Sequence, residues 1–475
     1  MVGKGWVLAV AGVCFGIQAF VSRYLFWDSY MGLVAGRYIA TNGIPTAEVL
    51  TSAAKPQWID QQWLAHWLFY QAWTFAGYAG TALASALSVT LAFTILAALM
   101  VKRGVPGPRA FVWALAALGV ALGGTVIRAQ SFSLPLAALL LWAILADSER
   151  PTFRARLLLV LPLLVIWANL HGSVLLGAGL LALYTVARAT AGAVDRAWRS
   201  SALYAMTAVL ALTTVVATPY GLGAFDYYRS LIDNQTVHLF ILEWSPPELG
   251  NLYSLGFFAL LVVTSLIVAY GFAARYRPPV VLLVGAAGLG LLALTGVRFQ
   301  VWFGLVATVL AADVLAHTRR PAPPFPTRVL RAGATVIGLF ALVAGLVLLT
   351  TSDDDFEPTL PRAAMASAAG YAQREPGTRI LPDELGSALL WKHPELLGRV
   401  AFDARLEQYP EEALLAWFQY LNGISPGWPA ASDGYDILVA SAVRRPDLVE
   451  RLTALPGWST LYSEPNGAAF VRARP

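Results

Sequence analysis

The sequence predicts a polytopic α-helical membrane protein, with about eleven transmembrane helices and a small C-terminal α/β domain. Composition is the first reason, because 57% of the 475 residues are hydrophobic and only 13% are charged, about half the charge of a soluble protein. The second reason is a series of long apolar runs over residues 1–351. The third is a change after residue 351, where short apolar strands alternate with helices.

The apolar runs are long enough, or nearly so, to cross ~30 Å of hydrocarbon. They cover residues 5–22, 80–101, 109–127, 131–146, 157–170, 172–190, 200–218, 252–273, 279–297, 300–317 and 330–351. No small-residue cleavage site follows the first run, so we interpret it as an uncleaved helix. The single cysteine, Cys14, excludes a disulfide within the chain.

Basic residues gather in alternate connectors between these runs. They are Lys102, Arg103 and Arg109, then Arg150, Arg154 and Arg156, then Arg188, Arg196 and Arg199, then Arg275 and Arg277, then Arg319, Arg320, Arg328 and Arg331. Because cytoplasmic loops carry the excess of Lys and Arg, this side is predicted to face the cytoplasm, together with the N-terminus. An odd number of helices then places the C-terminal domain outside. The net charge of +5 is explained this way, and no nucleic-acid partner is predicted.

Two long connectors are predicted on the outer side, at residues 23–79 and 219–251. Within the first, residues 29–41 and 61–77 are expected to form helices that lie along the interface. The second of these helices is rich in aromatic residues, which prefer the headgroup level. The alternative is that 61–77 spans the membrane, which would place the basic connectors outside.

Residues 1–351 are therefore predicted to form the membrane domain, and residues 352–475 an outer α/β domain. Strands are expected near 379–381, 399–402, 435–440, 458–462 and 468–471, in a partly parallel sheet. No glycine-rich phosphate loop opens a helix in this domain, so it is not predicted to bind a nucleotide.

With this predicted topology, the few polar residues of the membrane domain lie at the outer ends of the helices. Charge near hydrocarbon is costly, so a cluster of it at one rim indicates a site. Asp28 follows the first helix and is a candidate general base or ligand of a divalent ion; the alternative is a helix N-cap. Arg37 is a candidate partner for Asp28 or for a phosphate, and its alternative is an interfacial side chain that reaches toward anionic lipid.

The stretch 57–63 combines an acid, two tryptophans and three amides. Trp58 and Trp63 offer aromatic faces for a sugar ring, while Asp60 and Gln62 offer hydrogen bonds to its hydroxyl groups. The alternative is an aromatic belt at the membrane interface, with Asp60 as an N-cap.

Two arginines follow the ends of distant apolar runs, and each has a glutamine two residues later. These are Arg128 with Gln130 and Arg298 with Gln300. If the two guanidinium groups converge, they form a fork-shaped donor set for a phosphate or pyrophosphate. The alternative is that each arginine only reaches toward the headgroups.

Two further groups complete the candidates. Asn169 and His171 lie in the tight turn between the fifth and sixth helices, where polar groups need partners. His171 is a candidate donor to a phosphate oxygen, and the alternative is a hydrogen-bonded structural turn. Glu243 and Trp244 lie near the end of the second outer connector, where Glu243 is a second acid or a partner for an arginine.

Several of these motifs resemble bacterial members of the GT-C glycosyltransferase superfamily. In the first outer connector the resemblance is carried by Asp28, Gly36-Arg37-Tyr38-Ile39, Asn42-Gly43-Ile44-Pro45, Gln57-Trp58 and Gln62-Trp63-Leu64. Later in the membrane domain it is carried by Trp167-Ala168-Asn169-Leu170-His171-Gly172, Thr218-Pro219-Tyr220-Gly221, Glu243-Trp244-Ser245-Pro246 and Arg298-Phe299. In the tail it is carried by Asp403-Ala404-Arg405-Leu406-Glu407-Gln408-Tyr409. It implies a bacterial inner-membrane enzyme. Such an enzyme moves a sugar from a polyprenyl-phosphate donor to a lipid, glycan or protein acceptor outside the membrane.

The resemblance implies that Asp28 is the essential acid of the first outer loop. Asp28 would take the proton of the acceptor hydroxyl, with inversion at the anomeric carbon. Arg128, Arg298 and His171, with Arg37, would bind the donor phosphate, and Trp58, Asp60, Gln62, Trp63, Asn169, Glu243, Trp244 and Gln300 would line the sugar and acceptor pockets.

Metal dependence is only weakly predicted, because the loop has one acid where related proteins have two or bind a metal ion. Two other function classes remain open. A transporter or flippase of lipid-linked sugars would use the same arginines to hold a headgroup, although transporters usually place polar residues at mid-membrane. A non-catalytic assembly protein would use the rim residues only structurally.

Overall fold

The structure is a computed structural model that describes residues 2–150, 152–319 and 327–473. Arg320, one of the basic residues of the predicted cytoplasmic connectors, lies outside these ranges. The chain forms two compact units. Unit 1 comprises residues 1–23, 79–221 and 241–351, and unit 2 comprises residues 24–78, 222–240 and 352–475.

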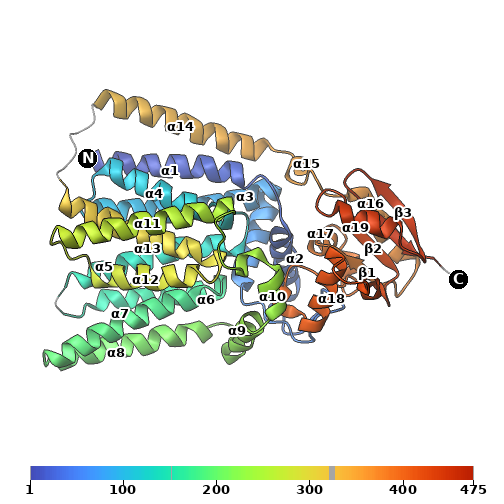
Figure 1. Ribbon diagram of the computed structural model, residues 1–475, viewed down its shortest axis with the longest axis horizontal. Helices are drawn as coiled ribbons and strands as arrows, with labels where there is room; N and C mark the ends of the chain where they lie inside the picture. The colour runs from blue at the N-terminus through green and yellow to red at the C-terminus, as the bar shows by residue number, and fades with distance from the viewer. Residues whose placement is uncertain (1, 151, 320–326, 474–475) are drawn as a thin grey trace. The chain divides into compact units, whose positions relative to one another are not determined.

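Unit 1 consists of long, mostly apolar helices, shown in Figure 1. They are α1 (Val2–Val21), the part of α3 (Trp63–Lys102) from Ala79 onward, α4 (Gly107–Ala121), α5 (Ser133–Ser148), α6 (Val160–Leu170), α7 (Val174–Val194), α8 (Trp198–Thr213), α11 (Leu252–Ala273), α12 (Val280–Ala293), α13 (Gln300–Thr318) and α14 (Thr327–Thr350). Each predicted apolar run therefore contains a helix.

Nine helices within the described ranges are long and apolar enough to cross a membrane. The helices over Ala155–Leu170 and Val280–Ala293 are apolar but shorter. The prediction of a polytopic helical fold is confirmed. The orientation across the membrane stays a prediction.

Helix α13 lies at the centre of unit 1, with every residue from Gln300 to Val314 buried. It packs against α4, α11 and α12. Phe303 of α13 meets Phe257 of α11 edge to face, with ring centroids 5.3 Å apart. The carboxylate of Asp313 is fully buried on this helix and is held by Arg103 at 2.8 Å and by the hydroxyl of Tyr276 at 2.7 Å. A buried acid of this kind is tolerated because both of its oxygens are paired.

Unit 2 contains shorter helices and the only sheet in the described residues. Its helices are α2 (Trp27–Asn42), the part of α3 up to Tyr78, α9 (Ala224–Ile232), α10 (Gln235–Phe240), α15 (Asp353–Phe356), α16 (Arg362–Arg374), α17 (Gly386–Lys392), α18 (Glu411–Asn422) and α19 (Pro446–Thr453). Its strands are β1 (Ile380–Pro382), β2 (Ile437–Ser441), β3 (Trp458–Glu464) and β4 (Gly467–Arg472). Segments of the two outer connectors predicted from the sequence thus fold in one unit with residues 352–475.

The sheet has the order β1-β2-β4-β3, and only β1 and β2 are parallel. The expected strand at 399–402 is reduced to isolated bridges from Val400, one to Ile380 and one to Thr51. On its other side, the backbone N–H groups of Ser52 and Ala53 donate to the carbonyls of Val400 and Ala401 at 2.9 and 3.3 Å.

Helix α3 contains a backbone break at Ala76 and Gly77. Gly77 has a φ of 59°, a conformation that glycine adopts without steric cost. The sequence predicted two separate helices here, and the break divides α3 in the same region. Whether the first part lies along a membrane interface stays a prediction.

Helices α2 and α3 approach closely within unit 2, and two glycines of α2 face α3. A Cβ atom on Gly36 would lie 2.1 Å from the backbone oxygen of His66. A Cβ atom on Gly32, one turn earlier, would lie 3.4 Å from the ring of Phe69, an ordinary contact. Only Gly36 is therefore required by the packing.

We predict that Gly36→Ala lowers the stability of the protein and that Gly32→Ala does not. The steric overlap at Gly36 is expected to lower the free energy of unfolding by about 1–3 kcal/mol. At either position, the better helix propensity of alanine raises the free energy of unfolding by about 1 kcal/mol. Thermal unfolding of the purified full-length variants, followed by intrinsic fluorescence, measures the difference. Equal midpoints for the two variants would contradict this account of the contact.

Candidate functional site

A polar pocket lies within unit 1, where three segments distant in the sequence come together. The first segment follows α4 and includes the short 3-10 helices Leu122–Gly124 and Ala129–Phe132. The second segment is the 3-10 helix Leu242–Trp244. The third segment is the 3-10 helix Val297–Phe299 together with the start of α13. The cavity has a volume of about 50 Å³. Its polar lining is made by Arg128, Gln130, Glu243, Arg298 and Gln300. Both arginines and both glutamines that the sequence singled out therefore line one cavity.

Arg128 and Glu243 form an ion pair inside this pocket. A guanidinium nitrogen of Arg128 donates to the Glu243 carboxylate at 2.5 Å, and the side chains are 18% and 38% exposed. Partial burial favours the neutral acid, but Arg128 and then Arg298 outweigh it, so the pKa of Glu243 lies below its ordinary value. Glu243 is therefore ionised at neutral pH, and the lining carries two positive charges and one negative charge.

Arg298 is held by an aromatic contact. Its guanidinium carbon lies 3.9 Å from the ring centroid of Trp244, a cation–π arrangement. Trp244 in turn meets Phe299 edge to face, with centroids 6.5 Å apart. The backbone N–H of Val297 donates to the carbonyl of Ser245 at 3.1 Å, which joins the two segments. The position of Arg298 is thus set by neighbours on both segments.

The local structure explains why these side chains reach the cavity. Helix α4 passes into a 3-10 turn at Leu122, and the backbone is extended at Arg128 (φ −155°, ψ 157°) before the next turn begins. Gly296 is extended before the turn that carries Arg298. A side chain that follows the end of a helix does not have to pack against the neighbouring helices. It can instead point into the space between segments.

Asn169 and His171 lie elsewhere in unit 1, in the turn between α6 and α7. The amide of Asn169 donates to the carbonyls of Val165 and Ala217 at 2.8 and 2.9 Å. The Nδ1 atom of His171 accepts from the backbone N–H of Ser173 at 3.0 Å and contacts its hydroxyl at 2.8 Å. Both side chains therefore have structural partners, and in the neutral ring of His171 the proton lies on Nε2.

Asp28 lies in unit 2, in the first turn of α2, and its side chain is half-buried. The N-cap position of this helix is Phe26, whose backbone N–H donates to the hydroxyl of Ser29 at 3.2 Å. Asp28 is therefore not the capping residue, which was the structural alternative drawn from the sequence.

Arg37 makes a defined structural contact within unit 2. Its guanidinium donates to the carbonyls of Leu390 and Trp391 at 2.8 and 3.1 Å and lies 4.6 Å from the Trp391 ring centroid. These carbonyls belong to the last turn of α17, where basic groups are favoured by the helix dipole. Arg37 joins α2 to α17, and we do not include it in the phosphate site proposed below.

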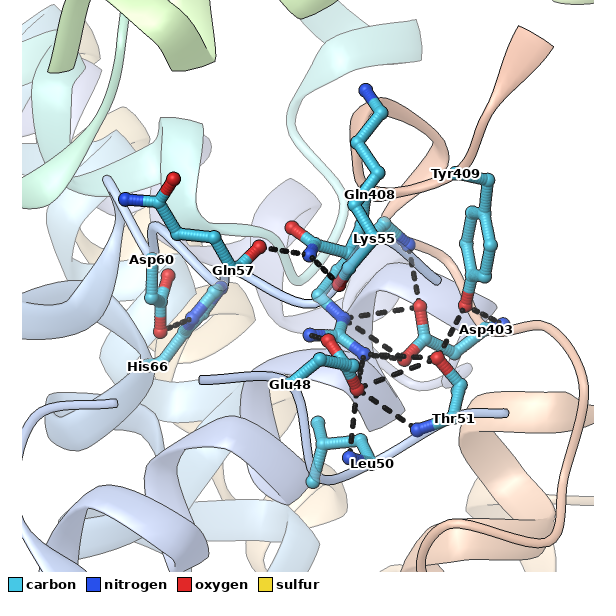
Figure 2. Close-up of polar contacts among 11 residues, drawn as sticks. Glu48, Leu50, Thr51, Lys55, Gln57, Asp60, His66, Asp403, Gln408 and Tyr409 are labelled. Carbon is cyan, nitrogen blue, oxygen red and sulfur yellow. Dashed lines mark hydrogen bonds and ion pairs between the residues drawn. The ribbon is translucent and has the colours of Figure 1, made fainter. Parts of the chain in front are cut away.

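The aromatic and polar stretch of the first connector is largely packed inside unit 2. Trp58 is 1% exposed, and the guanidinium of Arg405 lies 4.5 Å from its ring centroid. Asp60 is 4% exposed and contacts the ring of His66 at 2.9 Å, as Figure 2 shows. Since protein groups cover these two side chains, we do not include them in the proposed sugar pocket. Gln62 and Trp63 are half-buried, and their role stays a prediction.

Sequence reasoning missed the buried ionic cluster around Arg405, which joins the first connector to residues 400–409. Arg405 contacts Glu48 at 2.8 Å and Asp403 at 2.6 Å, and all three side chains are at most 6% exposed. Around it, the Asp403 N–H donates to the hydroxyl of Tyr409, which donates to Thr51, as Figure 2 shows. Asp403 and Arg405 belong to the motif that resembles the GT-C family, and nothing in the sequence pattern indicates Glu48 as their partner.

The described residues contain no group of three or more His, Cys, Asp or Glu side chains that could hold a metal ion.

The fold is similar to that of solved membrane glycosyltransferases. The archaeal oligosaccharyltransferase AglB from Archaeoglobus fulgidus, solved with an inhibitory peptide and a dolichol-phosphate, matches with a TM-score of 0.58 and 12% identity over 99% of this chain and 74% of that chain. ArnT from Cupriavidus metallidurans, solved with undecaprenyl phosphate, matches with a TM-score of 0.52 and 13% identity over 99% and 98%. The arabinofuranosyltransferase AftD from mycobacteria matches with a TM-score of 0.54 and 16% identity over 99% and 42%.

These proteins share the GT-C fold, and the chain has this fold. No family model and no curated protein matches the sequence. The likeness is therefore one of architecture, as expected at identities of 12–16%.

We predict that Arg405→Met lowers the stability of unit 2 strongly, because it leaves two buried carboxylates without their cation. Breaking a buried ion pair by removing one partner costs about 3–5 kcal/mol. The exposed Arg374, in the last turn of α16, supplies the control Arg374→Met, which is expected to change stability by less than about 0.5 kcal/mol. Hydrogen exchange of residues 435–441 in the full-length protein measures the effect, and unchanged protection in Arg405→Met would refute it.

Proposed function

We propose that the chain is a membrane glycosyltransferase. It moves a sugar from a polyprenyl-phosphate donor to an acceptor hydroxyl on the outer face of the membrane. The observation that carries the proposal is the shared cavity of Arg128, Arg298 and Glu243 in unit 1. The proposal is supported by the fold, which the chain shares with proteins solved with dolichol-phosphate and undecaprenyl phosphate.

The charge of the pocket suits the proposed donor. Two guanidinium groups and one carboxylate give a local charge of one positive unit, which matches the single negative charge of a sugar phosphodiester. When the bond between the anomeric carbon and the phosphate oxygen breaks, the leaving phosphate becomes a monoester and gains negative charge. Arginines that bind this oxygen interact most strongly in the transition state and so lower the barrier.

Glu243 holds Arg128 in position for this role. Their ion pair fixes one end of the guanidinium, and a planar guanidinium can hold a carboxylate and a phosphate oxygen at once. Arg298 is positioned by Trp244, whose ring centroid lies 3.9 Å from the guanidinium carbon. His171 is proposed as a further donor through Nε2, since its Nδ1 is occupied by Ser173.

Asp28 is proposed as the general base. As the acceptor oxygen attacks the anomeric carbon, its proton passes to the Asp28 carboxylate, and the electron pair of the breaking bond leaves with the phosphate. The products are the glycosylated acceptor, the polyprenyl monophosphate and a protonated Asp28. Attack opposite the leaving group inverts the anomeric carbon. No step is routed through a metal ion.

The membrane placement follows the charge of the connectors. We propose that the N-terminus is cytoplasmic and that residues 352–475 lie outside, in a bacterial inner membrane. The acceptor is then a lipid, glycan or protein of the cell envelope.

We predict that Arg298→Ala weakens binding of undecaprenyl phosphate about 10- to 100-fold, since a hydrogen bond to a charged group contributes about 1.5–3 kcal/mol. Arg128→Ala is expected to weaken binding further, because it also removes the cation that is paired with Glu243, and the unpaired carboxylate then repels the phosphate. Adding Glu243→Gln to Arg128→Ala should recover part of that loss. Native mass spectrometry of the protein in nanodiscs measures binding by all three variants. Arg199 of α8 is exposed, and Arg199→Ala is the control. Unchanged binding in both arginine variants would exclude this phosphate site.

We predict that Asp28→Asn lowers the rate of sugar transfer by about 10²- to 10⁴-fold, the usual contribution of a general base, and leaves undecaprenyl phosphate binding intact. Asp447 supplies a matched control, because it occupies the same position in the first turn of α19 and is exposed. Asp447→Asn is expected to keep full activity. Transfer is measured with radiolabelled polyprenyl-phosphate sugars and membrane extracts as acceptor, and full activity of Asp28→Asn would remove its proposed role.

A further inference from the structure

A second cavity lies entirely within unit 2 and is separate from the pocket of the two arginines. It has a volume of about 220 Å³, which corresponds to roughly seven water molecules at about 30 Å³ each. Its walls come from residues 24–27, Tyr30, residues 356–360, Glu384, Leu385, Ala388 and Arg444. A space of this size fits one monosaccharide ring and is smaller than the ~300–1,000 Å³ of sites for drug-sized ligands.

Aromatic side chains form one wall of this cavity. Tyr24, Phe26, Trp27 and Tyr30 line it, and Tyr24 and Phe26 remain 48% and 37% exposed. Tyr30 is buried, and its hydroxyl donates to Glu357 at 3.0 Å. The backbone N–H of Leu25 donates to the carbonyl of Phe356 at 3.2 Å, which joins this wall to the next segment. Hydrogen bonds therefore hold this wall in place, and two of its aromatic side chains remain accessible to a ligand.

The other wall carries charged groups that already have partners. Glu357 is held by Lys392 at 2.7 Å and by Arg362 at 3.2 Å. Glu384 is held by Arg445 at 2.5 Å, and Arg444 lies 3.8 Å from its other oxygen. The carboxylate of Glu357 has no exposed surface, so Arg444 and Glu384, whose side chains are 32% and 17% exposed, are the charged groups that a ligand can reach. A cationic ligand would gain little from a carboxylate that is already paired, and an anionic ligand would meet that carboxylate.

An aromatic lining together with an accessible carboxylate and guanidinium is the chemistry that recognises a neutral sugar. The apolar C–H face of the ring packs on an aromatic face, while its hydroxyls donate to the carboxylate of Glu384 and accept from the guanidinium of Arg444. We propose that this cavity binds a neutral saccharide, one hexose-sized ring at a time.

The place of the cavity indicates which saccharide it serves. Trp27 and Tyr30 belong to the first turn of α2, the turn that also carries Asp28. A saccharide bound here would lie against the helical turn that carries Asp28, although Asp28 itself does not line the cavity. The cavity is thus a subsite for a sugar residue of the acceptor, an assignment that rests on the proposed function, whereas saccharide binding itself rests on the cavity alone.

The test measures saccharide binding directly and needs no transfer reaction. Saturation-transfer difference NMR on the full-length protein in nanodiscs uses the methyl glycosides of glucose, galactose and mannose as probes. We expect saturable binding of at least one glycoside, with a dissociation constant on the order of millimolar. Tyr24→Ala and Arg444→Ala are expected to weaken it at least tenfold. Tyr462→Ala on β3, 42% exposed in the same unit, is the matched control and is expected to leave it unchanged.

The competing ligand chemistries are outcomes of the same experiment. Inorganic phosphate, Nα-acetyl-lysinamide and cyclohexanol represent an anion, a cation and an apolar group. Tighter binding of any of these than of the glycosides overturns the proposal, and so does the absence of saturable glycoside binding or an equal loss in Tyr462→Ala. Glycoside binding by a protein that transfers no sugar would refute the proposed function alone, and transfer without glycoside binding would refute the saccharide site alone.

Discussion

The cost of removing charge from water determines where this chain can place its ionic groups. Each unit contains a buried charged side chain that is held by partners of opposite charge. Asp313 is held by Arg103 and Tyr276 in the helical unit, and Arg405 is held by Glu48 and Asp403 in the other. Such pairs do not by themselves make a protein more stable than apolar packing would. They do restrict the arrangement, because moving one partner leaves the other buried without compensation.

The same constraint distinguishes the pocket of Arg128 and Arg298 from these structural pairs. Asp313 has no exposed surface, whereas Arg128 and Glu243 remain 18% and 38% exposed and line a cavity. Two guanidinium groups and one carboxylate line that cavity, and the anionic headgroup that we propose as the ligand would balance their net positive charge. Fully buried pairs thus organise the fold, and the charged groups that line a cavity are the candidates for binding.

Several residues with the same appearance in the sequence have different roles in the structure. Arg37 and Arg298 are both arginines near helix ends, but Arg37 is bound to the carbonyls of α17, while Arg298 lines the pocket. Trp58 and Trp244 both contact an arginine side chain, but only the arginine that contacts Trp244 lines the pocket. A sequence shows which residues are unusual for a membrane segment. It does not show which of them have a partner, because the partner lies 100 residues or more away, as Glu243 does from Arg128.

The sequence by itself determined the helical membrane architecture, the change of fold after residue 351 and the pairing of Arg128 with Arg298 as candidates. These features depend on local composition and on the spacing of apolar residues, which a linear chain displays directly. Only the tertiary structure decided that residues 24–78 fold with residues 352–475, that Arg405 is the buried cation of that unit, and that a second cavity lies beside the first turn of α2. These features depend on contacts between segments more than 300 residues apart, and neither periodicity nor spacing specifies which distant segments will meet.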